Sequence, residues 1–284
     1  MCPRLTDHYS LSDHYNTLFD KDGINVVRNF LTLQEVSDIN NELDLLFSQE
    51  SRNGSLYSTT VDEITKKVTL PNIAVRSVNL LELALRVRDS LKKNSKNFLN
   101  ATYKLTNVSI FEEKNHIKSL PWHTDNRPGM IRSTIYLQGG GKNSGAFQYM
   151  VGSHIRDYYV KHHLSNNQVK ELSEKIIDIY APMGSLILFD SFGFHAKRIC
   201  IEKRRIIMFE FQKEGLLYKT SSIPFSSINL SKTVLDNMDF FTNDASLYDH
   251  GCDVYFRNTI TTTARRKFKN LLLVLRYNLR KIIG

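Results

Sequence analysis

The chain is poor in cysteine, and this scarcity excludes two kinds of small structural site. Its 284 residues contain three cysteines, Cys2, Cys200 and Cys252. They are odd in number and far apart, which fits neither a disulfide framework nor a Cys-x-x-Cys zinc site. Free cysteines without a pairing pattern are typical of a reducing compartment, so we expect a cytoplasmic protein.

Long apolar runs are also missing. The longest purely apolar run, 271–275, has five residues, whereas a helix needs about 20 to span a bilayer. The first ten residues, MCPRLTDHYS, are polar and contain no apolar core of the kind found in signal peptides. The sequence therefore predicts neither a secreted nor a transmembrane protein.

Glycine and proline are not abundant either. With 13 Gly and 6 Pro, and with 41% hydrophobic and 24% charged residues, the composition excludes collagen-like, low-complexity and disordered classes. A chain of this composition can bury a real core. The length suits a single large domain, which we place over residues 1–259.

Acidic residues are absent from the end of the chain, and this locates the net charge. The whole chain carries +9, but its last 24 residues contain seven Lys or Arg and no Asp or Glu, so the remainder has 31 bases against 29 acids. A nearly neutral body argues against nucleic acid, which requires a basic face with interleaved aromatic residues.

The basic C-terminal segment has apolar residues at helical spacing. We therefore predict a basic amphipathic helix over residues 260–284. Such a helix either packs on its own domain or meets a partner or an anionic membrane surface through residues 265–283. The sequence leaves both readings open, including a cytoplasmic protein that is peripheral at the membrane.

Two helices precede a β-rich region. Thr32 and Glu35 form a capping-box pattern that opens a helix over 31–50, and apolar periodicity predicts a second helix over 78–93. Short β runs separated by glycine turns follow from about 103 to 213. This pattern is typical of a mainly β fold with flanking helices, built on a jelly-roll or cupin-like barrel. The expected strands are 23–30, 104–111, 132–138, 146–151, 176–180, 185–189 and 205–211.

One short motif points to metal chemistry. His123-Thr124-Asp125 is the only His-x-Asp in the chain, and the outer residues of such a triplet project to the same side of a strand. His195, just after a predicted strand, would complete the 2-His-1-carboxylate set that holds Fe(II) and leaves sites open for a keto acid and O2. Arg204 or Arg205, at the start of the next strand, would pair bidentately with the keto acid's far carboxylate.

Four ordered motifs carry a family resemblance. They are GINVVRNFLTLQEV at 23–36, PWHTD at 121–125, IYLQGGGKNSGAFQYMVGSH at 135–154 and APMGSLILFDSFGFHA at 181–196. In this order and spacing the chain resembles the phytanoyl-CoA dioxygenase family of Fe(II)/2-oxoglutarate oxygenases from about residue 23 to 212. The resemblance implies a double-stranded β-helix core, iron bound by His123, Asp125 and His195, and O2 as co-substrate.

The resemblance also implies an arginine that anchors 2-oxoglutarate after the second histidine. We prefer Arg205 to Arg204, because Arg205 shares a strand face with Ile207, Phe209 and Phe211, which we expect to point inward. The family's Asn-x-Ser stretch between histidine and arginine is replaced here by residues 197–203. Trp122 is expected to wall the cofactor pocket.

The implied reaction is hydroxylation of a small or lipid- or carrier-linked anionic metabolite, with release of succinate and CO2. Asp125 favours hydroxylation or another oxidation over halogenation, because related halogenases replace this carboxylate by a small residue. Arg127, Arg132 and Lys142 are basic residues near the motifs and are the candidates for holding the substrate's anionic group.

Three alternatives compete with this interpretation. The first is a non-enzymatic membrane- or partner-binding protein on a degenerate oxygenase scaffold. The second is a nucleic-acid oxygenase of the AlkB kind, which shares the His-x-Asp…His arrangement. The third is a metal-binding cupin that does not use 2-oxoglutarate.

Overall fold

The fold was analysed in a computed structural model of the chain. It describes residues 18–53, 60–62, 67–70, 77–113, 120–156, 161–214 and 230–241. The helix predicted over 260–284 lies outside these residues. Among the residues described, no helix is both long and apolar enough to cross a membrane.

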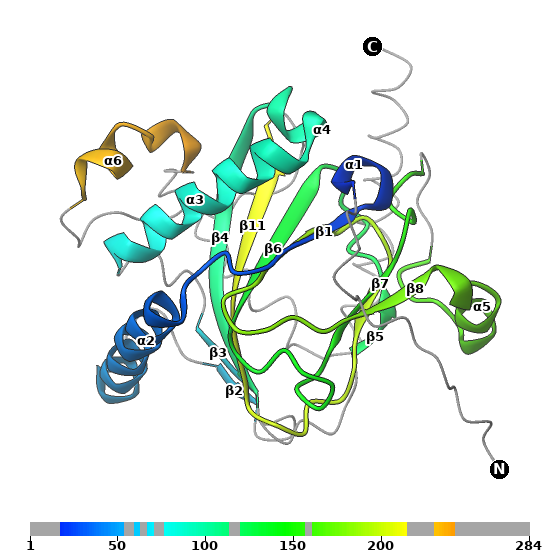
Figure 1. Ribbon diagram of the computed structural model, residues 1–284, viewed down its shortest axis with the longest axis horizontal. Helices are drawn as coiled ribbons and strands as arrows, with labels where there is room; N and C mark the ends of the chain where they lie inside the picture. The colour runs from blue at the N-terminus through cyan, green and yellow to red at the C-terminus, as the bar shows by residue number, and fades with distance from the viewer. Residues whose placement is uncertain are drawn as a thin grey trace, which may run out of the picture.

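Two antiparallel sheets face each other and form the body of the fold (Figure 1). The larger sheet has the strand order β1-β9-β6-β11-β4-β3-β2, and the smaller has β5-β10-β7-β8. The larger sheet comprises β1 (Ile24–Val27), β2 (Thr60–Asp62), β3 (Lys67–Leu70), β4 (Tyr103–Glu113), β6 (Met130–Gln138), β9 (Leu186–Asp190) and β11 (Arg204–Lys213). The smaller comprises β5 (Leu120–His123), β7 (Phe147–Met150), β8 (Ile176–Ile179) and β10 (His195–Lys197).

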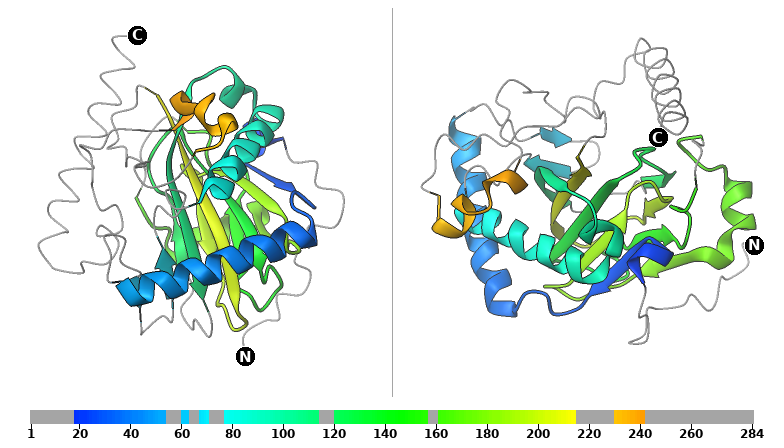
Figure 2. Two further views of the ribbon diagram at one scale, coloured as in Figure 1. Left: turned by 90° about the vertical axis from the view of Figure 1, so that its left-hand side faces the viewer. Right: turned by 90° about the horizontal axis from the view of Figure 1, so that it is seen from above.

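Helices cover the outer face of the larger sheet (Figure 2). Helix α2 (Leu33–Asn53) crosses this face, and α3 (Val78–Asn94) and α4 (Lys96–Leu99) lie beside it. Helix α5 (Asn166–Glu171) lies on the other side of the molecule, near β8. The remaining helical turns are α1 (Phe19–Asp22), α6 (Lys232–Leu235), η2 (Ser173–Lys175) and η3 (Met238–Phe240).

The predicted elements correspond closely to the observed ones. Thr32 and Glu35 form the predicted reciprocal cap at the start of α2, with Glu35 N–H donating to Thr32 Oγ1 at 3.2 Å and Thr32 N–H to Glu35 Oε2 at 2.7 Å. Gly145 and Gly152 lie in turns and have φ values of 69° and 73°, which glycine adopts without strain. Strands β2, β3, β5 and β10, each three or four residues long, were not predicted.

Two separate cores lie on either side of the larger sheet. One lies under the helices and contains Ile207, Phe209 and Phe211; the other lies between the sheets and contains Ile206. The expectation that the face of Ile207, Phe209 and Phe211 points into the barrel is therefore wrong. Both faces of β11 are buried because helices cover one and the smaller sheet covers the other, so apolarity does not distinguish inside from outside.

Candidate metal centre

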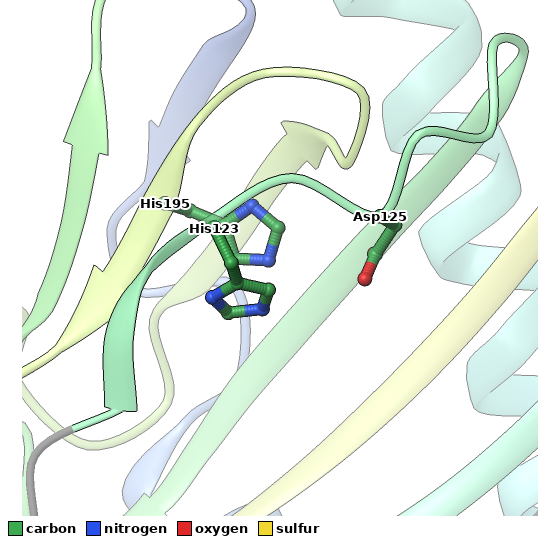
Figure 3. A group of neighbouring side chains, drawn as sticks. All are labelled: His123, Asp125 and His195. Atoms are coloured by element: carbon green, nitrogen blue, oxygen red, sulfur yellow. The ribbon is translucent and has the colours of Figure 1, made fainter. Parts of the chain in front are cut away.

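Three side chains converge at one end of the space between the sheets (Figure 3). His123 is the last residue of β5 and His195 is the first of β10, and the two are direct cross-strand partners. Asp125 follows in the loop after β5. One ligand atom from each residue lies within 4.8 Å of the other two. The arrangement brings together two imidazoles and a carboxylate predicted from the sequence to be neighbours.

Backbone carbonyls orient both imidazole rings. His123 Nδ1 lies 2.8 Å from Pro121 O, and His195 Nδ1 lies 3.0 Å from Gly193 O. In each ring the carbonyl requires Nδ1 to carry the proton, which leaves Nε2 as the lone-pair donor. Metal-binding histidines are commonly fixed in this way by a second hydrogen bond.

Burial keeps both imidazoles uncharged. Desolvation, together with the neighbouring His195, lowers the pKa of His123 to about 4. Desolvation likewise lowers the pKa of His195, although Asp125 opposes the shift. Neutral imidazoles are the form that binds a metal ion.

Asp125 is held ionised and in place. Burial opposes ionisation of its carboxyl, but the Arg132 guanidinium, with an ion-pair distance of 2.9 Å, holds the pKa well below its usual range. The Asp125 N–H donates to Ser191 O at 3.1 Å, which joins this loop to the segment that leads to His195. Two neutral imidazoles and one carboxylate fit the ligand set of a non-haem Fe(II) oxygenase.

Arg156 clamps together the two segments that carry these side chains. Thr124, between His123 and Asp125, donates its hydroxyl to Phe192 O at 2.7 Å and accepts from Arg156 at 2.8 Å. Arg156 also donates to Phe192 O and lies 3.9 Å from the centre of the Phe192 ring. Sequence reasoning missed this clamp, because its members are about 30 residues apart and have no shared motif.

The two candidate arginines of β11 point in opposite directions. Arg205 contacts Glu112 and reaches α2, where its Nη2 lies 2.6 Å from an Asp44 oxygen. The preferred 2-oxoglutarate ligand thus lies on the outer face of the larger sheet, so the strand-phase argument for it was wrong. Arg204 alternates with Arg205 and faces the space between the sheets, on the side of Ile206 and Tyr136.

Arg204 belongs to a buried charged cluster with a net charge of +1. Its Nη2 and the Nζ of Lys197 both contact Glu113 Oε2, at 2.8 and 2.6 Å. Within the described part of the chain, Arg204 Nε has no hydrogen-bond acceptor. Lys197 is two residues beyond His195 on β10, about 7 Å along the strand. Arg204 Nε is therefore an unused donor among the described residues, and a guanidinium N–H donor beside the candidate centre fits a carboxylate.

The other residues proposed from the sequence have different positions. Arg132 is buried and ion-paired with two carboxylates. Lys142 is exposed in the loop after β6, at the opposite end of that strand from Arg132, so the structure does not bring it to the centre. Trp122 is half-buried and precedes His123 on β5, so alternation directs it to the opposite face.

Arg127 lies close enough to Asp125 for its charge to help lower the pKa of that carboxyl. It is half-buried, and no side-chain hydrogen bond or ion pair joins it to another of the described residues. Arg127 is therefore the one predicted substrate residue that combines proximity to the centre with an available guanidinium.

Two further histidines border the centre. A short segment pairs with the edge of β5: Thr124 N–H donates to His162 O at 3.0 Å, and Leu164 N–H to Trp122 O at 3.1 Å. The rings of His162 and His163 consequently lie 5.7 and 6.1 Å from that of His123. A His-His dipeptide was visible in the sequence, but only a pairing across 40 residues places it here.

Comparison with protein families gives a match over more than half of the chain. Residues 19–196 match the family described as phytanoyl-CoA dioxygenase (PhyH). No curated protein matches the sequence.

Several solved structures share the fold at low sequence identity. EctD from S. alaskensis, with 2-oxoglutarate and 5-hydroxyectoine, is 16% identical with a TM-score of 0.60, over 81% of this chain and 84% of EctD. HygX from Streptomyces hygroscopicus, with nickel and 2-oxoglutarate bound, is 16% identical with a TM-score of 0.54, over 74% of this chain and 93% of HygX. The epimerase SnoN from nogalamycin biosynthesis is 12% identical with a TM-score of 0.57, over 76% of this chain and 90% of SnoN.

Proposed function

The chain belongs to the phytanoyl-CoA dioxygenase family and is an Fe(II)/2-oxoglutarate-dependent oxygenase, and from that premise we propose that it hydroxylates a small anionic metabolite at a centre formed by His123, Asp125 and His195. The convergence of these three side chains within 4.8 Å is the observation that carries the assignment. When bound, Fe(II) and 2-oxoglutarate supply the activation of O2, with succinate and CO2 as co-products.

The protein prepares the centre for this chemistry. Carbonyl groups fix the tautomers of His123 and His195, and Asp125 supplies one negative charge. The rings of Phe147 and Phe189 lie 5.9 and 5.3 Å from that of His195 and shield it from water. A shielded centre confines oxidation to the bound substrate and limits side reactions.

Arg204, in place of Arg205, is proposed to bind the far carboxylate of 2-oxoglutarate. Its interior position and its Nε without an acceptor among the described residues support this role. The family match ends at residue 196, so the choice of arginine depends on the structure. Lys197 is a second cation for the same carboxylate.

The substrate is proposed to bind through an anionic group at Arg127, with His162 and His163 on the same border of the centre. Arg127 has a half-buried guanidinium close to Asp125, and Arg132 is already engaged by carboxylates. HygX has been solved with hygromycin B, and EctD with 5-hydroxyectoine. These small-molecule ligands of proteins with the same fold support a metabolite over a macromolecule.

Labelled oxygen tests this function. The iron-loaded protein is incubated with 2-oxoglutarate, a metabolite extract and 18O2, and the products are analysed by mass spectrometry. We expect one 18O atom in an anionic metabolite and one in succinate, since hydroxylation divides O2 between the two products. The Asp125→Ala variant should form neither. Label in no metabolite, or label only in added DNA or RNA oligonucleotides, would contradict the proposal.

A further inference from the structure

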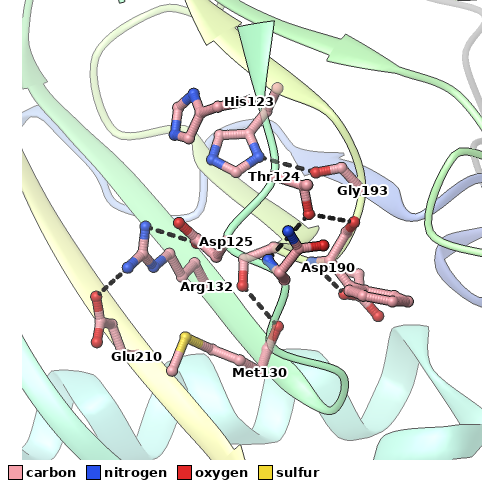
Figure 4. A network of polar contacts seen from close by, with 12 residues as sticks. His123, Thr124, Asp125, Met130, Arg132, Asp190, Gly193 and Glu210 are labelled. Carbon is pink, nitrogen blue, oxygen red and sulfur yellow. Dashed lines mark hydrogen bonds and ion pairs between the residues drawn. The ribbon is translucent and has the colours of Figure 1, made fainter. Parts of the chain in front are cut away.

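Arg132 is held between two carboxylates at the edge of the metal centre (Figure 4). Its Nη1 lies 2.9 Å from Asp125 Oδ2 and its Nη2 lies 2.7 Å from Glu210 Oε1. The side chains of Arg132, Asp125 and Glu210 are only 10%, 4% and 12% exposed. Arg132 and Glu210 are cross-strand partners on β6 and β11, so the sheet itself fixes this pair.

The charges of Asp125, Arg132 and Glu210 together determine how strongly this group attracts a metal ion. A guanidinium beside a metal-binding carboxylate repels a divalent cation, and burial makes that repulsion stronger. Glu210 adds a negative charge on the far side of Arg132, so the group of three has a net charge of −1. This is the charge that Asp125 alone would present with its two neutral histidines. Glu210 therefore offsets part of the repulsion that Arg132 would exert on a metal ion held by Asp125.

The guanidinium also restricts movement. Its planar fork contacts one carboxylate on each side, and a strand anchors each end of the Arg132–Glu210 pair. Rotation of the Asp125 carboxylate would lengthen the first contact, and rotation of Arg132 would lengthen the second. Side chains beyond the ligands that fix ligand orientation typically change metal affinity by about 10- to 100-fold.

We propose that Arg132 is a positioning residue for the metal-binding carboxylate of Asp125, and that Glu210 is its charge partner. This inference rests on the proposed function, because it requires Asp125 to be a metal ligand. It reassigns Arg132, which the sequence suggested as a contact for the substrate's anion. Its guanidinium lies between Asp125 and Glu210 and acts on the centre through Asp125.

Cobalt binding tests the proposal without relying on catalysis. Co(II) is titrated into the full-length metal-free protein and followed by its visible absorption, which reports both affinity and ligand geometry. Glu210→Gln removes the negative charge on the far side of Arg132 and should weaken binding by about tenfold or more. The double variant Arg132→Met/Glu210→Gln restores the net charge of −1 without the bridge. It should still bind at least about tenfold more weakly, with an altered spectrum.

A matched control removes a comparable ion pair elsewhere. Arg198 and Asp178 are 2.7 Å apart on the smaller sheet, and Arg198→Met/Asp178→Asn should bind Co(II) with wild-type affinity and spectrum. If the variant Arg132→Met/Glu210→Gln does the same, Arg132 does not position the ligand. Should that variant fail to fold, as judged by circular dichroism, Arg132→Lys replaces it. Lysine lacks the rigid planar fork that holds one carboxylate on each side, so unchanged affinity and spectrum in Arg132→Lys would likewise overturn the inference.

The same titration distinguishes a failure of this inference from a failure of the proposed function. If wild-type protein does not bind Co(II), or Asp125→Ala binds it equally well, the proposed metal centre is wrong. If wild-type protein binds Co(II), Asp125→Ala loses binding and Arg132→Met/Glu210→Gln retains it unchanged, only the role of Arg132 is wrong.

Discussion

Single side chains at the centre are controlled mainly by backbone groups and burial. Backbone carbonyl groups fix the tautomers of His123 and His195, and desolvation keeps both rings neutral. The His-x-Asp spacing predicted which residues meet, because only local geometry was needed. It could not predict which arginine faces inward. Both faces of β11 are buried, one under the helices and one between the sheets, so apolarity could not show which face points inward.

Asp190, at the end of β9, gives a prediction for stability against pH. Desolvation raises the pKa of its carboxyl to about 7, although the Phe192 N–H and Arg156 oppose the shift. An unfolded chain loses this proton near pH 4, so the folded state holds it more tightly. The contribution to stability is greatest below about pH 4 and is lost as the pH rises to about 7.

Asp190→Asn should remove this dependence while keeping an oxygen that accepts from Phe192. We expect the variant to gain stability relative to wild type by about 1 to 3 kcal/mol between pH 4 and 8. Urea unfolding of the metal-free proteins across this range measures the gain. Asp38→Asn, on the exposed side of α2, is the control and should follow the wild-type curve. A constant difference between Asp190→Asn and wild type would contradict the shift.

The strands that carry the two histidines of the centre are among the shorter elements of the described part of the fold. Strands β5 and β10 have four and three residues, too few for a periodic pattern to predict. Pairing with each other and with longer strands defines them, and such pairings are not written in local sequence. The long helices α2 and α3, with their caps and apolar faces, were predictable because their signals are local.

Two capping boxes in the described part of the chain should differ in their effect on stability. Thr32 caps α2, which buries Val36 and Leu43, whereas Ser165 caps α5, which buries no residue. Thr32→Ala should lower the free energy of unfolding by about 1 kcal/mol. Ser165→Ala should lower it by less than about 0.3 kcal/mol, because α5 can fray without global unfolding.

Urea denaturation measures both losses, and hydrogen exchange in α5 shows whether local fraying replaces global destabilisation. Equal losses in the two variants would mean that burial does not decide how far a cap's effect spreads. The same comparison tests whether α2 is an integral part of the core over the larger sheet.

At the scale of the whole molecule, the two sheets supply different side chains to the centre. The smaller sheet and its loop supply His123, Asp125 and His195, while the larger supplies Arg132, Glu210 and Arg204. The ordered motifs predicted the family and the barrel, because each motif matches a turn or strand end of that fold. Which groups each sheet supplies depends on how the sheets pack, and this packing brings Lys197 and Glu113, 84 residues apart, into contact.

An anaerobic titration of Fe(II) and 2-oxoglutarate, followed by the visible charge-transfer absorption of an iron-chelated 2-oxo acid, tests the central claim most directly. Wild-type protein should show the absorption, and Asp125→Ala should not. Arg205→Met should titrate like wild type, whereas Arg204→Met should require at least about tenfold more 2-oxoglutarate, as expected for loss of a charged hydrogen bond. Absence of the absorption in wild-type protein, or its loss in Arg205→Met but not in Arg204→Met, would contradict the account.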